Sequence, residues 1–227
     1  SQNTIVGDSA GAAMTSGTEN VAIGTSALDA NTTANANTAV GRMALSANTT
    51  GASNTALGHQ SLILNTTGAT NTAVGKDSLG ANTTGQGNTA VGSSALKANT
   101  TANNNAAFGA GAMFTNTTGT ENTALGLNTL YANTTANGGT AVGSQALTSV
   151  TTGNNNTAVG TNSLLVNTTG SENTAVGRLS LDANTTGTNN VAVGNSALTA
   201  NTTAVCNVGI GDNAGNSVTT GNNNVLI

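Results

Sequence analysis

A pentapeptide, Asn-Thr-Ala-Val-Gly or a close variant, recurs along the chain at an unvarying interval of 17 residues. Its final glycine occurs once in every repeat, and no insertion or deletion disturbs the spacing. These glycines are Gly7, Gly24, Gly41, Gly58, Gly75, Gly92, Gly109, Gly126, Gly143, Gly160, Gly177, Gly194 and Gly211. A short, exact period is typical of stacked repeats, in which each unit contacts only its neighbours.

Seventeen residues are too few for a helical-hairpin repeat, which needs about 34. We number the repeat from its asparagine, so that the valine is position four and the glycine is position five. The pattern predicts an all-β fold, a parallel β-solenoid (β-roll) with one 17-residue coil per repeat and about 13 coils. We expect a single repeat domain over residues 1–227, with 13 full repeats in 3–223 and partial coils at 1–2 and 224–227.

Each coil should contain a short strand at Thr-Ala-Val and a turn at the glycine that follows it. The glycine is expected to need a backbone conformation that a Cβ atom would obstruct. A second stretch, Ala-Leu-x-Ala, should return along the other side of the coil. Asn-Thr-Thr-Gly-x-x should then close the coil, and glycine and asparagine in this stretch should supply the residues with positive φ.

Three sets of stacked side chains follow from this arrangement. Position four (Val40 and Val74, for example) and position nine (Leu45 and Leu79) should form two apolar columns in a narrow interior. The alanine at position three should face the opposite way and permit close packing against something outside the coil. The asparagine at position one, which only Gly139 replaces, should form a hydrogen-bonded ladder along the axis.

The composition gives this solenoid a thin core. Only three residues are aromatic, namely Phe108, Phe114 and Tyr131, and proline is absent. One valine and one leucine per coil bury little apolar surface, so we expect a homo-oligomer, either a trimer or an end-to-end polymer. The net charge of −4 and the four Lys and Arg residues argue against nucleic acid as a partner. No apolar run is long enough to predict a membrane span.

The repeats at 37–41 and 20–24 resemble the head repeats of trimeric autotransporter adhesins. The longer phrase Asn-Thr-Ala-Val-Gly-x-x-Ala-Leu-x-Ala-Asn-Thr-Thr-Gly is similar to the collar and shaft repeats of phage tail fibres, and the resemblance covers nearly the whole chain. It implies a left-handed parallel β-roll, three chains per fibre, and an extracellular role in attachment.

Residues with catalytic or ligand-binding chemistry are few and scattered. His59 is the only histidine, and we interpret it as a solvated turn residue. Cys206, the only cysteine, could form an intermolecular disulfide. Asp8 and Asp212 share position six of the terminal repeats and could bind a cation or dock an end, although plain turn residues are the simpler interpretation. The glutamates at position seventeen are too far apart to pair: Glu19, Glu121 and Glu172.

No nucleophile–histidine–acid set, metal cluster or phosphate-binding loop is present in the sequence. We therefore expect no enzyme activity, no cofactor, no metal and no catalytic residue, and the binding residues stay unknown at this stage. Asn-Thr-Thr is also a glycosylation sequon, but we interpret it as a turn chosen for its geometry. The sequons begin at Asn31, Asn48, Asn65, Asn82, Asn99, Asn116, Asn133, Asn167, Asn184 and Asn201.

The expected function is a structural, extracellular fibre segment, on a cell surface or virion, that extends or presents an attachment surface to a receptor or glycan. A first alternative is a self-assembling filament in which residues 225–227 stack on residues 1–3 of the next chain. A second is an ice- or glycan-binding solenoid that uses its threonine and asparagine ladders. These alternatives stay open from sequence alone.

Overall fold

The computed structural model describes residues 2–227; Ser1, with the part of the expected filament contact that it would make, lies outside the described residues. The all-β prediction is confirmed: the chain is a parallel β-solenoid of about 13 turns with about 17 residues per turn. It divides into two compact units, Ser1–Thr118 and Gly119–Ile227. The expectation of a single domain over 1–227 stays a prediction.

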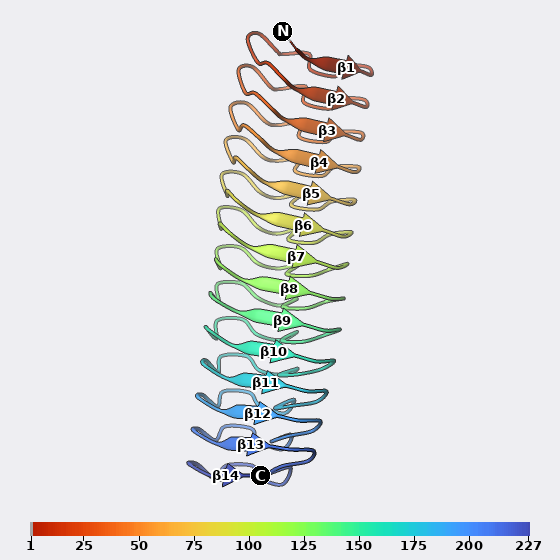
Figure 1. The fold of residues 1–227 in the computed structure, drawn as a ribbon. Helices are drawn as coiled ribbons and strands as arrows, with labels where there is room; N and C mark the ends of the chain where they lie inside the picture. Colours follow the sequence, from red (N-terminus) through yellow and green to blue (C-terminus); the bar gives the residue numbers. More distant parts are fainter. Residues whose placement is uncertain (1) are drawn as a thin grey trace. The chain divides into compact units, whose positions relative to one another are not determined.

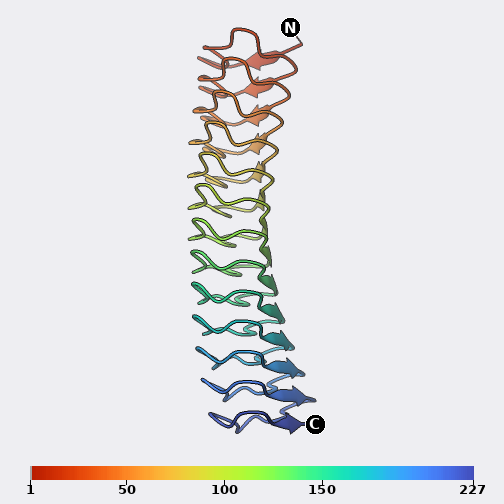
Figure 2. The same cartoon turned by 90° about the vertical axis from the view of Figure 1, so that its left-hand side faces the viewer.

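Each coil contributes one strand, and within each unit successive strands stack along one side of the coils (Figures 1 and 2). Neighbours pair parallel and in register, so that Ala39 lies beside Ala56 and Val40 beside Leu57. The first unit contains β1 (Thr4–Val6), β2 (Val21–Ile23), β3 (Thr38–Val40), β4 (Thr55–Leu57), β5 (Thr72–Val74), β6 (Thr89–Val91) and β7 (Ala106–Phe108). The second contains β8 (Thr123–Leu125), β9 (Thr140–Val142), β10 (Thr157–Val159), β11 (Thr174–Val176), β12 (Val191–Val193), β13 (Val208–Ile210) and β14 (Val225–Leu226).

The glycine at position five ends each strand for the reason that the sequence predicted. Gly41 has a φ of 135°, which favours glycine. A Cβ atom built there would lie 2.5 Å from the carbonyl oxygen of Gly58, one coil later. Both the backbone angle and the close approach of successive coils therefore require a residue without a side chain.

The other residues with positive φ occupy positions seven, nine and seventeen. Position nine was unexpected, because most residues there are leucines such as Leu79, with a φ of 49°; the others are Met113, Gly11 and Gly215. The left-handed conformation costs a residue with a Cβ about 1–2 kcal/mol. Complete burial of the leucine, worth about 1.5–3 kcal/mol, offsets this cost. The prediction of positive φ in the closing stretch is confirmed at its last position, seventeen, as at Gly87 and Asn104, and is wrong for the asparagine and glycine of Asn-Thr-Thr-Gly, which are not left-handed.

The prediction of two apolar columns is confirmed for position nine and wrong for position four. Leu45 and Leu79 are fully buried, whereas Leu57 is 46% exposed. The alanines at position three, expected to face outward, are fully buried instead in β2–β12. The reason is the width of the interior: a Cβ at Gly209, at position three, would lie 2.8 Å from Leu198 Cγ. The leucine of position nine therefore packs directly against position three, and the buried residue there is small: alanine in β2–β12 and glycine at Gly209.

Two asparagine ladders complete the core of each unit, and the first confirms the sequence prediction. At position one, Asn54 Oδ1 accepts a hydrogen bond from the backbone N–H of Asn71 (3.0 Å), and Asn54 Nδ2 donates to the Gly68 carbonyl (2.8 Å). At position twelve, Asn65 Nδ2 donates to Asn48 Oδ1 (2.9 Å) and also to the Gly68 carbonyl (2.9 Å). These side chains are fully buried, and they satisfy the Gly68 carbonyl of their own coil and the Asn71 N–H of the next, as buried polar atoms require.

One coil of the second unit lacks both ladder residues. Gly139 stands at position one and Val150 at position twelve. The Gly153 carbonyl, which two such asparagines would otherwise reach, accepts a hydrogen bond from Asn156 Nδ2 of the next coil at 3.1 Å. Asn156 thus supplies the Gly153 carbonyl with a donor in place of the missing asparagines.

Candidate binding site

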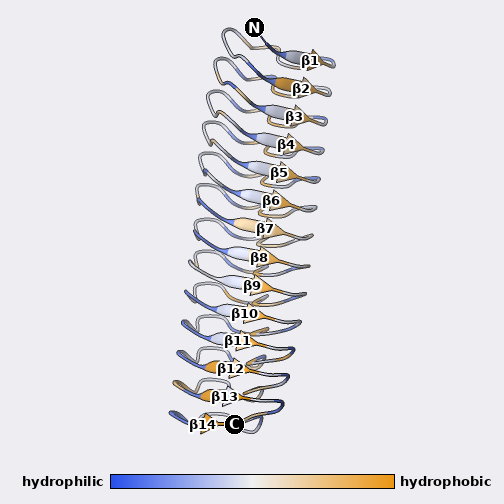
Figure 3. Ribbon diagram, viewed as in Figure 1, coloured by the Kyte–Doolittle hydropathy of each residue, from blue (hydrophilic) through white to orange (hydrophobic). Residues whose placement is uncertain are grey.

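The reversal of positions three and four gives each unit an exposed strand face, which consists of the side chains at positions two and four. Threonine is the commonest residue at position two and valine at position four. Figure 3 shows the hydrophobic ends of most strands in orange. Leu57 and Phe108 in the first unit, and Leu125 in the second, are between 39% and 49% exposed. This face places apolar side chains in contact with solvent at one-coil intervals.

A second regular surface is the threonine row, formed by the second threonine of Asn-Thr-Thr at position fourteen. These side chains, such as Thr50, Thr67 and Thr84, are exposed in every coil of the described chain that carries them. The first threonine differs, because Thr49 Oγ1 donates to the carbonyl of Thr66 at 3.1 Å and is half-buried. One threonine of each pair therefore holds adjacent coils together, and the other faces water.

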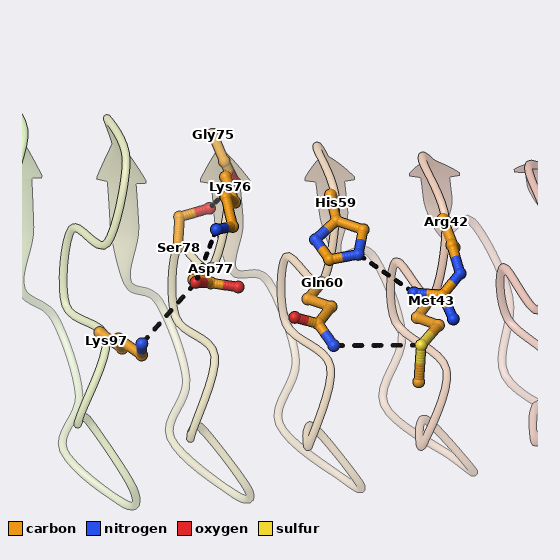
Figure 4. Close-up of polar contacts among 9 residues, drawn as sticks. All are labelled: Arg42, Met43, His59, Gln60, Gly75, Lys76, Asp77, Ser78 and Lys97. Carbon is orange, nitrogen blue, oxygen red and sulfur yellow. Dashed lines mark hydrogen bonds and ion pairs between the residues drawn. The ribbon is translucent and has the colours of Figure 1, made fainter.

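In the described part of the first unit, charged side chains cluster on a different part of the coil. Residues 37–104 contain three basic residues and one acid, a formal charge of +2, whereas the rest of the chain contains one basic residue and seven acids, a formal charge of −6. At position six of three successive coils stand Arg42, His59 and Lys76, which we call the cationic row (Figure 4). Arg42 Nη1 lies 3.2 Å from His59 Nε2. Since a guanidinium has no acceptor, Nε2 is the acceptor in this contact.

Asp77 links Lys76 of the cationic row to Lys97 in the next coil. Asp77 Oδ2 lies 4.0 Å from Lys76 Nζ and 3.7 Å from Lys97 Nζ. The Asp77 side chain is 18% exposed, and the two lysines are 65% and 44% exposed. Lys97 Nζ also lies 5.8 Å from the centre of the Phe114 ring, within the range of a cation–π interaction. These contacts hold the lysine over an apolar wall.

That wall belongs to a hollow of about 450 Å³ in the first unit. Its apolar lining includes Ile63, Leu64 and Phe114, and its polar lining consists of Gln60, Asp77 and Lys97. The hollow is lined by Gly80 at position ten, where the adjacent coils carry Ile63 and Lys97. Gly80 has no left-handed φ, so the backbone does not require glycine here. The absent side chain is what leaves the space.

The residues singled out from the sequence have ordinary surroundings, with one exception. Cys206 is a free, exposed thiol, and Asp8 is exposed. Asp212 accepts hydrogen bonds from Asn195 Nδ2 and Asn213 Nδ2, each at 2.9 Å. The exception is His59, which lies in a turn as expected but is half-buried and contacts Arg42. The three glutamates at position seventeen are exposed and lie in separate coils.

The sequon asparagines are buried ladder residues. Asn48, Asn65 and Asn82 have no exposed surface, and their amide nitrogens donate within the core. A glycan on these nitrogens has no space in the folded chain, which agrees with a geometric role for Asn-Thr-Thr.

Sequence reasoning overlooked the cationic row and the hollow. The row was readable, because Arg42, His59 and Lys76 share the 17-residue spacing that aligns coil positions. The hollow was not, because it depends on how side chains from several coils, such as Leu64, Lys97 and Phe114, lie around Gly80. Within the described residues 2–227, no group of three or more His, Cys, Asp and Glu could hold a metal ion, and no helix is long and apolar enough to cross a membrane. In comparisons with known proteins, no family model, curated protein or solved structure matches the chain.

Proposed function

We propose that the chain is a structural segment of an extracellular fibre, of the kind found in phage tail fibres and trimeric adhesins, which presents an attachment surface. The observation that carries the proposal is the pair of asparagine ladders. Backbone and side-chain hydrogen bonds run from coil to coil, as between Asn54 and Asn71, and fix the same geometry at every repeat of a unit. A scaffold of this kind has a constant surface period, which suits a rigid spacer or display element.

The proposal includes self-association through the strand face. Exposed apolar side chains at one-coil intervals match a partner that has the same interval, and a second copy of the chain has it by construction. The sequence suggested that the position-three alanines pack against something outside the coil. Because those alanines are buried, we assign this contact to the side chains at positions two and four. Three copies, as the resemblance to fibre repeats implies, would bury this face around a common axis and supplement the thin core.

The mass in solution tests this proposal. A trimer has three times the 21.7 kDa of the chain, and light scattering behind a sizing column measures it directly. We expect Leu57→Ser on the strand face to shift the distribution toward monomer without changing the far-UV circular dichroism. The control is Leu127→Ser, because Leu127 is similarly exposed (52%) but stands at position six, away from the strand face. A monomeric unmodified chain would contradict the trimer.

A second candidate function is ice binding, and the threonine row favours it. Identical exposed hydroxyl and methyl groups repeat at the coil spacing, about 4.7–4.8 Å in a parallel sheet. Thermal hysteresis of the purified chain, compared with a variant in which Thr50, Thr67 and Thr84 are serine, measures this activity. Absence of hysteresis in the unmodified chain would exclude it.

A further inference from the structure

We infer that the cationic row and the adjacent hollow form a binding site for an acidic saccharide, a sugar chain with carboxylate groups. The inference rests on the proposed attachment role for its biological purpose and names the ligand class for that role. Binding itself is measurable on the chain as it is, whatever its oligomeric state.

Charge is the first argument. A formal charge of +2 in residues 37–104 stands against −6 in the rest of the chain, so an anionic ligand is attracted here and repelled elsewhere. Arg42, His59 and Lys76 occupy the same position of successive coils, which places them about 4.7–4.8 Å apart along the axis. An extended ligand parallel to the axis would therefore meet a nitrogen donor at each of three coils.

Shape is the second argument. The hollow, at about 450 Å³, falls in the range of small-ligand sites. Its apolar wall, with Leu64 and Phe114, suits the C–H face of a sugar ring. Lys97, held above this wall by the Phe114 ring and Asp77, can donate to a carboxylate or hydroxyl without leaving its place.

Asp77 decides between classes of anion. Both lysine contacts use Oδ2 of its carboxylate, which lies in the lining of the hollow beside Gln60. A carboxylate there disfavours an anion that has no hydroxyl group to donate to it, such as a fatty acid. It accepts hydrogen bonds from hydroxyl groups, which a saccharide carries on every ring. The combination of cations, an acceptor carboxylate and an apolar wall thus favours a sugar that has both hydroxyls and acid groups.

The test uses a hyaluronan tetrasaccharide, which carries glucuronate carboxylates, and its carboxyl-reduced form, titrated into the full chain by calorimetry or NMR. We expect the acidic form to bind at least about tenfold more tightly than the reduced form, since charge-assisted hydrogen bonds are lost on reduction. Equal binding of both forms, or no binding of the acidic form at concentrations up to about 10 mM, would overturn the inference.

Matched variants locate the site. Lys76→Gln should weaken binding by about tenfold, whereas Arg178→Gln, the same coil position in the second unit, should leave it unchanged. Gly80→Ile should fill the hollow and abolish binding, whereas Ser46→Ile, the same coil position outside the hollow, should not. Far-UV circular dichroism and the mass in solution of each variant separate loss of binding from misfolding and from loss of the fibre assembly. Equal losses in Lys76→Gln and Arg178→Gln would show non-specific attraction and refute the site.

Discussion

Replacement of Asn71 by alanine tests whether the position-one ladder stabilises the solenoid. Asn71 Oδ1 accepts from the backbone N–H of Asn88 at 3.0 Å, and Asn71 Nδ2 donates to the Gly85 carbonyl at 2.8 Å. In the variant the Asn88 N–H is buried without this acceptor, at a cost of about 1–3 kcal/mol. The Gly85 carbonyl keeps a donor, Asn82 Nδ2 at 3.1 Å, so the second loss is near 1 kcal/mol. We expect a total destabilisation of about 2–4 kcal/mol.

A control with the same kind of bond is available at the surface. Asn103 Oδ1 accepts from the backbone N–H of Gln86 at 2.7 Å, but both residues are exposed. In Asn103→Ala, water replaces the lost acceptor, and the cost should stay below about 0.5 kcal/mol. Urea unfolding followed by circular dichroism measures both variants, and amide hydrogen exchange reports whether the Asn88 N–H loses protection. If Asn71→Ala and Asn103→Ala differ by less than about 0.5 kcal/mol, the buried ladder does not have the stabilising role argued above.

Three further changes test the coil geometry by the same unfolding measurement. Gly92→Ala should cost about 1–3 kcal/mol or more, because Gly92 has a φ of 135° and its Cβ would lie 2.5 Å from the carbonyl oxygen of Gly109, one coil later. The control is Gly80→Ala, because Gly80 has no positive φ and its Cβ would lie 3.2 Å from the nearest atom. Equal costs for the two variants would contradict the reasoning. Leu79→Ala should cost about 2–5 kcal/mol through the cavity it leaves, and a stabilising result would mean that left-handed strain outweighs burial at position nine. Gly139→Asn combined with Val150→Asn should stabilise the second unit by about 1–3 kcal/mol by restoring both ladders, and no gain would mean that the coil has already compensated for them.

The architecture was predictable because its cause is local and repeated. Every seventeenth residue has the same surroundings, so one glycine, Gly41, and one leucine, Leu45, describe the same position in many coils. The burial of Leu45 and the axial hydrogen bonds of Asn54 followed from residue type alone. The Arg42–His59–Lys76 row was also present in the spacing, although it was not recognised as a site.

The face that each strand residue presents was not predictable by hydrophobicity. A period of two allows either Ala39 or Val40 to point inward, and the larger apolar residue was the natural choice. The interior, however, already holds the leucine of position nine and two asparagine amides, so alanine is the residue that fits. The left-handed backbone of Leu79 was hidden for a similar reason, since leucine gives no local signal for positive φ.

The sequence by itself determined the period, the strand positions, the glycine that ends each strand and the ladder of position one, because each depends on a residue and its copies one coil away. Tertiary structure alone decided which side of the strand is buried, which threonine of each pair faces water, and where a missing side chain at Gly80 opens a hollow beside Lys97. The physical reason is volume. Hydrogen-bonding partners repeat with the sequence, whereas the space left by one side chain depends on how the whole coil closes around it.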